Sequence, residues 1–86
     1  MGIAVFDTYV FKNTGKRMHF DILVPEGVKE NQVYTFGQVY LKSKGLEQLS
    51  LSAKECRFCH IAQPEKNIVD AIERNGFAIL EMEGCD

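Results

Sequence analysis

Two runs of β-branched and aromatic residues, separated by a short turn sequence, constrain the fold of this chain more than any other feature. Residues 3–10 and 17–24 flank Asn-Thr-Gly at 13–15, and this pattern predicts a β-hairpin. A three-residue loop with Gly15 in the left-handed conformation places the large apolar side chains on one face. A two-residue loop would mix apolar and polar residues on both faces, so the hydrophobic pattern favours the three-residue loop.

The same register gathers four polar side chains on the other face of the hairpin. Tyr9 is expected opposite His19, and Asp7 opposite Asp21. A histidine beside carboxylates and a phenol can act as an acid or a base, because its pKa is easily moved across neutrality. The simpler interpretation is a solvated sheet face stabilised by cross-strand polar pairs, and we favour it for this group taken alone.

Two helices and two more strands are predicted after the hairpin. Asn31 can cap a helix that ends at Gly45, and Pro64 is suited to begin a second helix that ends at Gly76. Alternating residues at 49–53 predict a short strand between the helices.

Residues 77–83 predict the last strand, with Ala78, Leu80 and Met82 facing the core. The expected fold is therefore a single α+β domain over residues 1–86. It has ββαβαβ order and a mostly antiparallel sheet, with two helices packed on one face.

The most concentrated chemistry in the sequence is the Cys-x-x-Cys-His motif formed by Cys56, Cys59 and His60. Two thiolates at this spacing can bind one metal ion if the segment turns, whereas an extended strand would point them to opposite sides. No Gly or Pro lies between or just after the cysteines to force that turn. A complete zinc site would combine Cys56, Cys59 and Cys85 with one histidine.

His19 is a better fourth zinc ligand than His60, because His60 directly follows Cys59 and reaches the same ion awkwardly. In that case the hairpin's polar face and the cysteines form one site, with Asp21 orienting the imidazole. Burial of three reduced cysteines without any metal is the plainer alternative.

Three other uses of the motif are less favoured. Cys-x-x-Cys-His is the attachment sequence of c-type haem, but that haem is attached outside the cytoplasm and no export signal precedes the motif. A thioredoxin-like pair needs a helix start to favour the thiolate, and the next helix is predicted near Pro64, several residues too late. A peroxide- or disulfide-responsive role, with Cys85 as a resolving thiol, remains open.

Charge and hydropathy exclude several classes of partner. Ten basic and twelve acidic residues give a net charge of −2, which argues against nucleic acid and anionic membranes as partners. No apolar run approaches the roughly 20 residues of a membrane span. We expect a cytoplasmic protein, where an odd number of cysteines does not form a disulfide framework.

Four segments together carry a resemblance to a known family: residues 7–10 (DTYV), 18–25 (MHFDILVP), 53–60 (AKECRFCH) and 81–85 (EMEGC). Over nearly its full length the chain resembles the bacterial family catalogued as domain of unknown function two thousand and twenty-four. The resemblance implies a small stand-alone bacterial protein with no assigned activity. Its segments include the residues selected above on chemical grounds.

The leading interpretation is a small binding module that holds zinc through the cysteines and a histidine. A thiol-redox protein or a Cys/His enzyme acting on a small molecule is the competing class. The third is a protein-interaction domain with structural cysteines, which binds a partner or itself through Tyr34, Val39 or an exposed sheet edge.

Overall fold

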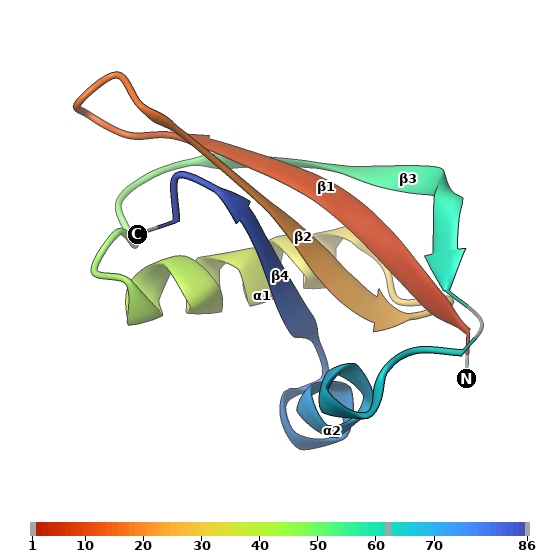
Figure 1. Ribbon diagram of the computed structural model, residues 1–86. Helices are drawn as coiled ribbons and strands as arrows, with labels where there is room; N and C mark the ends of the chain where they lie inside the picture. The colour runs from red at the N-terminus through yellow and green to blue at the C-terminus, as the bar shows by residue number, and fades with distance from the viewer. Residues whose placement is uncertain (1, 62, 86) are drawn as a thin grey trace.

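The computed structural model describes residues 2–61 and 63–85, except for the side chains of Arg57, Phe58 and His60 within a strand. Its elements, in chain order, are β1 (Ile3–Phe11), β2 (Arg17–Pro25), α1 (Glu30–Ser43), β3 (Leu51–Ile61), α2 (Lys66–Asn75) and β4 (Ala78–Glu83). The strands form a single sheet in the order β3-β1-β2-β4, and each neighbouring pair is antiparallel (Figure 1). The α+β class, the ββαβαβ order and the antiparallel sheet are thus as expected.

The β1–β2 hairpin has the register that the hydrophobic pattern predicts. Tyr9 is paired with His19 and Asp7 with Asp21. The loop closes through a hydrogen bond of 2.8 Å from the Lys12 N–H to the Lys16 carbonyl, and Gly15 has a φ of 87°. A residue other than glycine rarely adopts this φ, so Gly15 allows the three-residue loop.

One face of the sheet is covered by α1. The helix buries Val33, Tyr40 and Leu41 against alternate residues of the central strands. Close approach depends on Gly37, where a Cβ would lie 2.6 Å from Leu51 Cδ2. The strand residues of this core are Ala4, Phe6, Val10, Met18, Phe20, Ile22, Val24 and Ala53.

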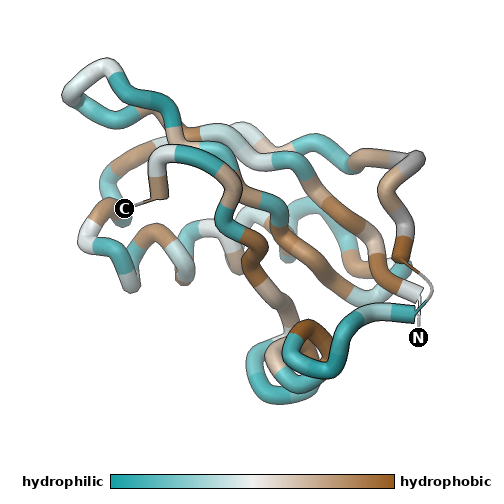
Figure 2. Tube along the Cα trace, viewed as in Figure 1, coloured by the Kyte–Doolittle hydropathy of each residue, from teal (hydrophilic) through white to brown (hydrophobic). Residues whose placement is uncertain are grey.

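The opposite face is covered at one end by α2, which packs Ile72 and, less deeply, Ile68 and Ala71 against Ile3, Val5, Leu23 and Ala78. The expectation that both helices pack on one face was therefore wrong. The physical reason is that β1 and β2 are apolar at both alternating sets of positions at this end, so both faces need cover. In Figure 2 apolar residues follow the central strands, while the hairpin tip is hydrophilic.

The last strand does not have the predicted orientation. Ile79 pairs with Ile22 and packs toward α1, whereas Leu80 pairs with Asp21 and is 46% exposed. Met82, also expected in the core, is 52% exposed and lies at a register shift between the Phe20 and His19 pairs. Only Ala78 is buried as expected, and it lies on the α2 face.

A polar cluster joins the C-terminal end of the chain to α1. The Tyr40 hydroxyl donates a hydrogen bond to the Glu81 carboxylate, and Lys44 Nζ lies 3.0 Å from the same carboxylate and 3.0 Å from the Cys85 carbonyl. Burial and then the bond to Glu81 raise the pKa of Tyr40 above its ordinary range. The bonds from Tyr40 and Lys44 lower the pKa of Glu81.

Removing the hydroxyl of Tyr40 tests the strength of this connection. We expect Tyr40→Phe to lower the free energy of unfolding by about 1 kcal/mol, because one part-buried hydrogen bond to a charged acceptor is lost while Lys44 still neutralises Glu81. Urea unfolding of Tyr40→Phe, Glu81→Gln and the double variant measures the coupling directly. Additive effects of the two single changes would contradict the expectation.

Candidate functional site

The Cys-x-x-Cys segment lies within β3, at a bend of the strand. The Val5–Cys56 and Ile3–Ile61 pairs are separated by two residues along β1 but by five residues along β3. The extra residues form a bulge that turns the strand sharply (Figure 1). This bulge supplies the turn for which the sequence offers no Gly or Pro, and Cys56 and Cys59 form a disulfide with their Cα atoms 5.3 Å apart.

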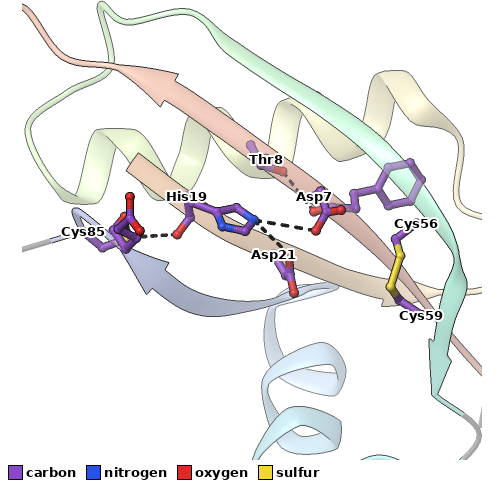
Figure 3. Close-up of polar contacts among 9 residues, drawn as sticks. Asp7, Thr8, His19, Asp21, Cys56, Cys59 and Cys85 are labelled. Atoms are coloured by element: carbon purple, nitrogen blue, oxygen red, sulfur yellow. Dashed lines mark hydrogen bonds and ion pairs between the residues drawn. A yellow bond between two sulfur atoms is a disulfide. The ribbon is translucent and has the colours of Figure 1, made fainter. Parts of the chain in front are cut away.

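The three cysteines do not meet in one group. Cys85 is a buried free thiol beyond the end of β4, with Sγ 3.5 Å from the backbone carbonyls of His19 and Glu83. Figure 3 places Cys85 and the disulfide at opposite ends of the polar cluster. Of the other predicted ligands, the side chain of His60 lies outside the described residues.

The structure brings together Asp7, His19 and Asp21 on the face opposite α1. His19 Nε2 lies 3.7 Å from Asp7 Oδ1 and 3.9 Å from Asp21 Oδ1. One potential ligand atom from each of the three residues lies within 4.8 Å of the other two. The residues come from the two central strands and converge beyond the part of this face that α2 covers (Figure 3).

Two of these ligand atoms are buried without a partner. His19 Nε2 and Asp21 Oδ1 have no hydrogen-bond partner among the described residues, and their distance of 3.9 Å exceeds a hydrogen bond. The Asp21 side chain is 9% exposed, whereas that of Asp7 is 43% exposed. The group thus has a buried base at Asp21 and an opening toward solvent at Asp7.

Burial is the main cause of an unusually high pKa at Asp21. Together with hydrogen bonding and charge from Asp7, burial raises the pKa of Asp21 from 3.8 to about 6, and His19 opposes this shift. Two carboxylates directly opposite one another in a sheet repel each other. Such a pair lowers stability, and strain of this kind is concentrated at functional sites.

The orientation of His19 is fixed by an aromatic stack. Its ring lies 4.4 Å from the ring of Tyr9 at an interplanar angle of 10°, and Arg17 Cζ lies 4.9 Å from the centroid of the Tyr9 ring. Tyr9, predicted as part of the polar cluster, therefore serves as a platform for the imidazole. The sequence analysis did not identify the contact of Arg17 with the Tyr9 ring. Arg17 lies two residues from His19 on the same face of β2, and this position could have indicated the contact.

An imidazole nitrogen and two carboxylate oxygens are a ligand set for first-row divalent metals. Ligand atoms on one zinc ion are about 3 to 3.5 Å apart at its usual bond lengths. The separations of His19 Nε2 from Asp7 Oδ1 and Asp21 Oδ1 are a few tenths of an ångström longer. The three ligand atoms all lie within 4.8 Å of one another, so the side chains would have to move closer together to hold one ion.

A groove of about 410 Å³ lies away from this group, between α1 and the region where α2 meets β4. Its lining is mainly apolar and includes Phe36, the exposed Val39 and Phe77. Tyr34, the other residue considered for partner binding, is half-buried and donates a hydrogen bond of 3.3 Å to the Ala53 carbonyl. The groove holds less convergent polar chemistry than the Asp7–His19–Asp21 group.

Comparison with known proteins agrees with the resemblance noted from the sequence. Residues 1–82 match the family described as a domain of unknown function, DUF2024, and the chain belongs to this family. It is similar to protein NE1680 from Nitrosomonas europaea, whose NMR structure was a target of the Northeast Structural Genomics Consortium. The identity is 31%, all of both chains is covered, and the TM-score is 0.81. No curated protein matches the chain.

None of the helices in the described part of the chain is long and apolar enough to cross a membrane.

Proposed function

We propose that this protein is a metal-binding domain whose site is formed by Asp7, His19 and Asp21, with zinc as the expected ion. The observation that carries the proposal is the pair of buried, unpartnered atoms, His19 Nε2 and Asp21 Oδ1, that face one another. Each buried polar atom without a partner costs about 1 to 3 kcal/mol. A cation between them would remove both costs.

The charge of the site also supports a divalent ion. Two carboxylates balance a charge of +2 when the imidazole is neutral, so the bound site would be electrically neutral in its half-buried setting. Cys56 and Cys59 cannot supply thiolates while they form a disulfide. The proposal therefore keeps His19 and zinc from the expected site and replaces the cysteines with the two aspartates.

Three protein ligands leave at least one coordination position for water or a small molecule. The half-exposed Asp7 side is where that position would open to solvent. A metal at such a position acts as a Lewis acid, which is compatible with either a binding role or a hydrolytic one.

Zinc titration of the apo protein tests the proposal. We expect about one zinc per chain by calorimetry. At a free zinc concentration 100 times Kd, binding adds about 2.7 kcal/mol to the free energy of unfolding. For a domain of this size, this raises Tm by roughly 10 to 20 °C. Equal Tm values in zinc and in a chelator would refute the proposal.

A further inference from the structure

The Cys56–Cys59 disulfide is a reactive group that the proposed metal site does not use. Its cysteines are three positions apart, and a disulfide that closes so short a loop constrains the unfolded chain less than one that closes a long loop. Regular pairing of β3 with β1 stops at Cys56 and resumes at Ile61, so the bond spans the bulge and not a regular part of the sheet. The fold therefore depends little on this bond, which can open and close in the folded protein.

The two cysteines of the disulfide differ in their access to solvent. Cys59 is exposed and Cys56 is half-buried. Because thiol–disulfide exchange requires a thiolate to reach one of the two sulfurs, access decides which sulfur reacts first. Cys85 is buried and lies at the opposite end of the polar cluster (Figure 3), so the thiol that can resolve an adduct on Cys59 is Cys56.

We infer that Cys56 and Cys59 form a redox-active pair that exchanges its disulfide with an external dithiol. Cys59 is the sulfur that is attacked and that carries the mixed disulfide, and Cys56 is the resolving sulfur. This activity goes beyond the proposed metal site and does not depend on it, because neither cysteine belongs to the group whose ligand atoms lie within 4.8 Å of one another.

The reductive step balances with the dithiol as the only other reactant. The first thiol of the dithiol loses its proton to water and bonds to Cys59 Sγ, the Cys56–Cys59 bond breaks, and Cys56 leaves as a thiolate that takes a proton from water. The second thiol, also deprotonated by water, attacks the dithiol sulfur that is bonded to Cys59 and releases Cys59, which is then protonated. Two electrons pass to the protein, and the dithiol becomes a disulfide. The reverse steps restore the Cys56–Cys59 bond.

A helix start beside the cysteines is not required for this reaction. β3 runs through both residues, so neither thiolate gains the stabilisation that a helix N-terminus gives to the pair in thioredoxin-like proteins. In the reductive direction the external dithiol supplies the attacking thiolate, and the protein supplies the disulfide. Exposure of Cys59 is therefore the property that the reaction needs.

The first experiment uses the oxidised full-length wild type in the presence of a chelator. It is incubated with dihydrolipoate, a small dithiol, or with a reduced thioredoxin-like protein, and thiols are trapped by alkylation and located by mass. We expect new thiols on Cys56 and Cys59 while the near-ultraviolet circular dichroism remains that of a folded protein. Faster reduction by the dithiol protein at equal thiolate concentration would identify a protein as the partner, and equal rates would identify a small dithiol. A disulfide that stays intact until the protein unfolds would overturn the inference.

The second experiment assigns the roles of the two sulfurs. Cys56→Ser and Cys59→Ser are matched variants that each keep one cysteine of the pair, and Cys85→Ser is the control. Each reduced protein reacts with an aromatic disulfide that releases a coloured thiol. We expect Cys59 in Cys56→Ser to react at least about tenfold faster than Cys56 in Cys59→Ser, because access controls the rate.

Resolution by Cys56 gives a further signature. The reduced wild type and Cys85→Ser should form the adduct only transiently and restore the disulfide, whereas Cys56→Ser should keep the adduct on Cys59. An adduct that lasts as long in the wild type as in Cys56→Ser, or equal rates in the two serine variants of the pair, would contradict the assigned roles. These outcomes leave the metal proposal untouched, because the chelator removes zinc from the assay.

Discussion

Replacing His19 with alanine should remove stoichiometric zinc binding while leaving the protein folded. His19 provides the only nitrogen atom of the Asp7–His19–Asp21 group, and its Nε2 is 3.7 and 3.9 Å from the two carboxylates. Without it, two opposed carboxylates would have to hold zinc alone. We expect the affinity to fall by more than the roughly 10- to 100-fold lost with a residue that only supports a ligand.

His60→Ala is the matched control, because it removes the other histidine of the chain. Zinc affinity of both variants is measured by calorimetry, and folding by the near-ultraviolet circular dichroism of the apo proteins. We expect His60→Ala to bind zinc like the wild type. Loss of binding in His60→Ala with retention in His19→Ala would contradict the assignment and return the site to the Cys-x-x-Cys-His segment.

Replacing Asp21 with asparagine should stabilise the apo protein at neutral pH. Burial and Asp7 raise the pKa of Asp21 from 3.8 to about 6. This shift means that the charged form costs up to roughly 3 kcal/mol in the folded state. Because a buried amide keeps part of the desolvation cost, we expect a gain of about 2 kcal/mol in the free energy of unfolding.

The pH dependence of this effect has a definite sign. Between pH 3.8 and about 6 the folded protein retains the Asp21 proton and the unfolded chain does not. The contribution of Asp21 to the free energy of unfolding therefore falls as pH rises through this window, and it stays low at higher pH. In Asp21→Asn this group no longer titrates, so the free energy of unfolding should fall less steeply as pH rises through this window.

Urea unfolding of the apo proteins at several pH values, in the presence of a chelator, measures both effects. Asp70→Asn is a control on α2, where the carboxylate forms an exposed ion pair of 3.1 Å with Lys66. That change should alter stability by no more than about 1 kcal/mol, because exposed pairs contribute little. A loss of stability in Asp21→Asn at neutral pH would show instead that the Asp21 carboxylate makes a stabilising native contact. The same variant should bind zinc more weakly, since the carboxylate that lowers the stability of the apo protein is also a proposed zinc ligand.

The part of the site that lies in the hairpin could be predicted, because its geometry follows from one local feature, the length of the hairpin loop. Once Gly15 sets the loop length, alternation along β1 and β2 places Asp7 opposite Asp21 and Tyr9 opposite His19. What the sequence did not reveal is that Asp21 is buried. Its burial depends on neighbouring strands that are distant in sequence.

The errors concern tertiary packing and irregular strands. Ile3, Val5 and Leu23 share a face with the polar cluster, and this was the available signal that a helix covers that face as well. The cysteines were expected to follow a short strand, yet β3 continues through them and bends at a bulge. A bulge depends on pairing with the neighbouring strand and needs no Gly or Pro, so local turn chemistry does not reveal it.

The bend in β3 also limits how the sheet can extend. β3 is an outer strand, and an outer strand with a long straight edge can recruit a strand from another molecule. Here the regular pairing ends at Cys56, and the backbone then leaves the plane of the sheet. An incoming strand would find only residues 51–56 in a continuous straight run. The backbone path that places the disulfide therefore also hinders the growth of β-aggregates along this edge.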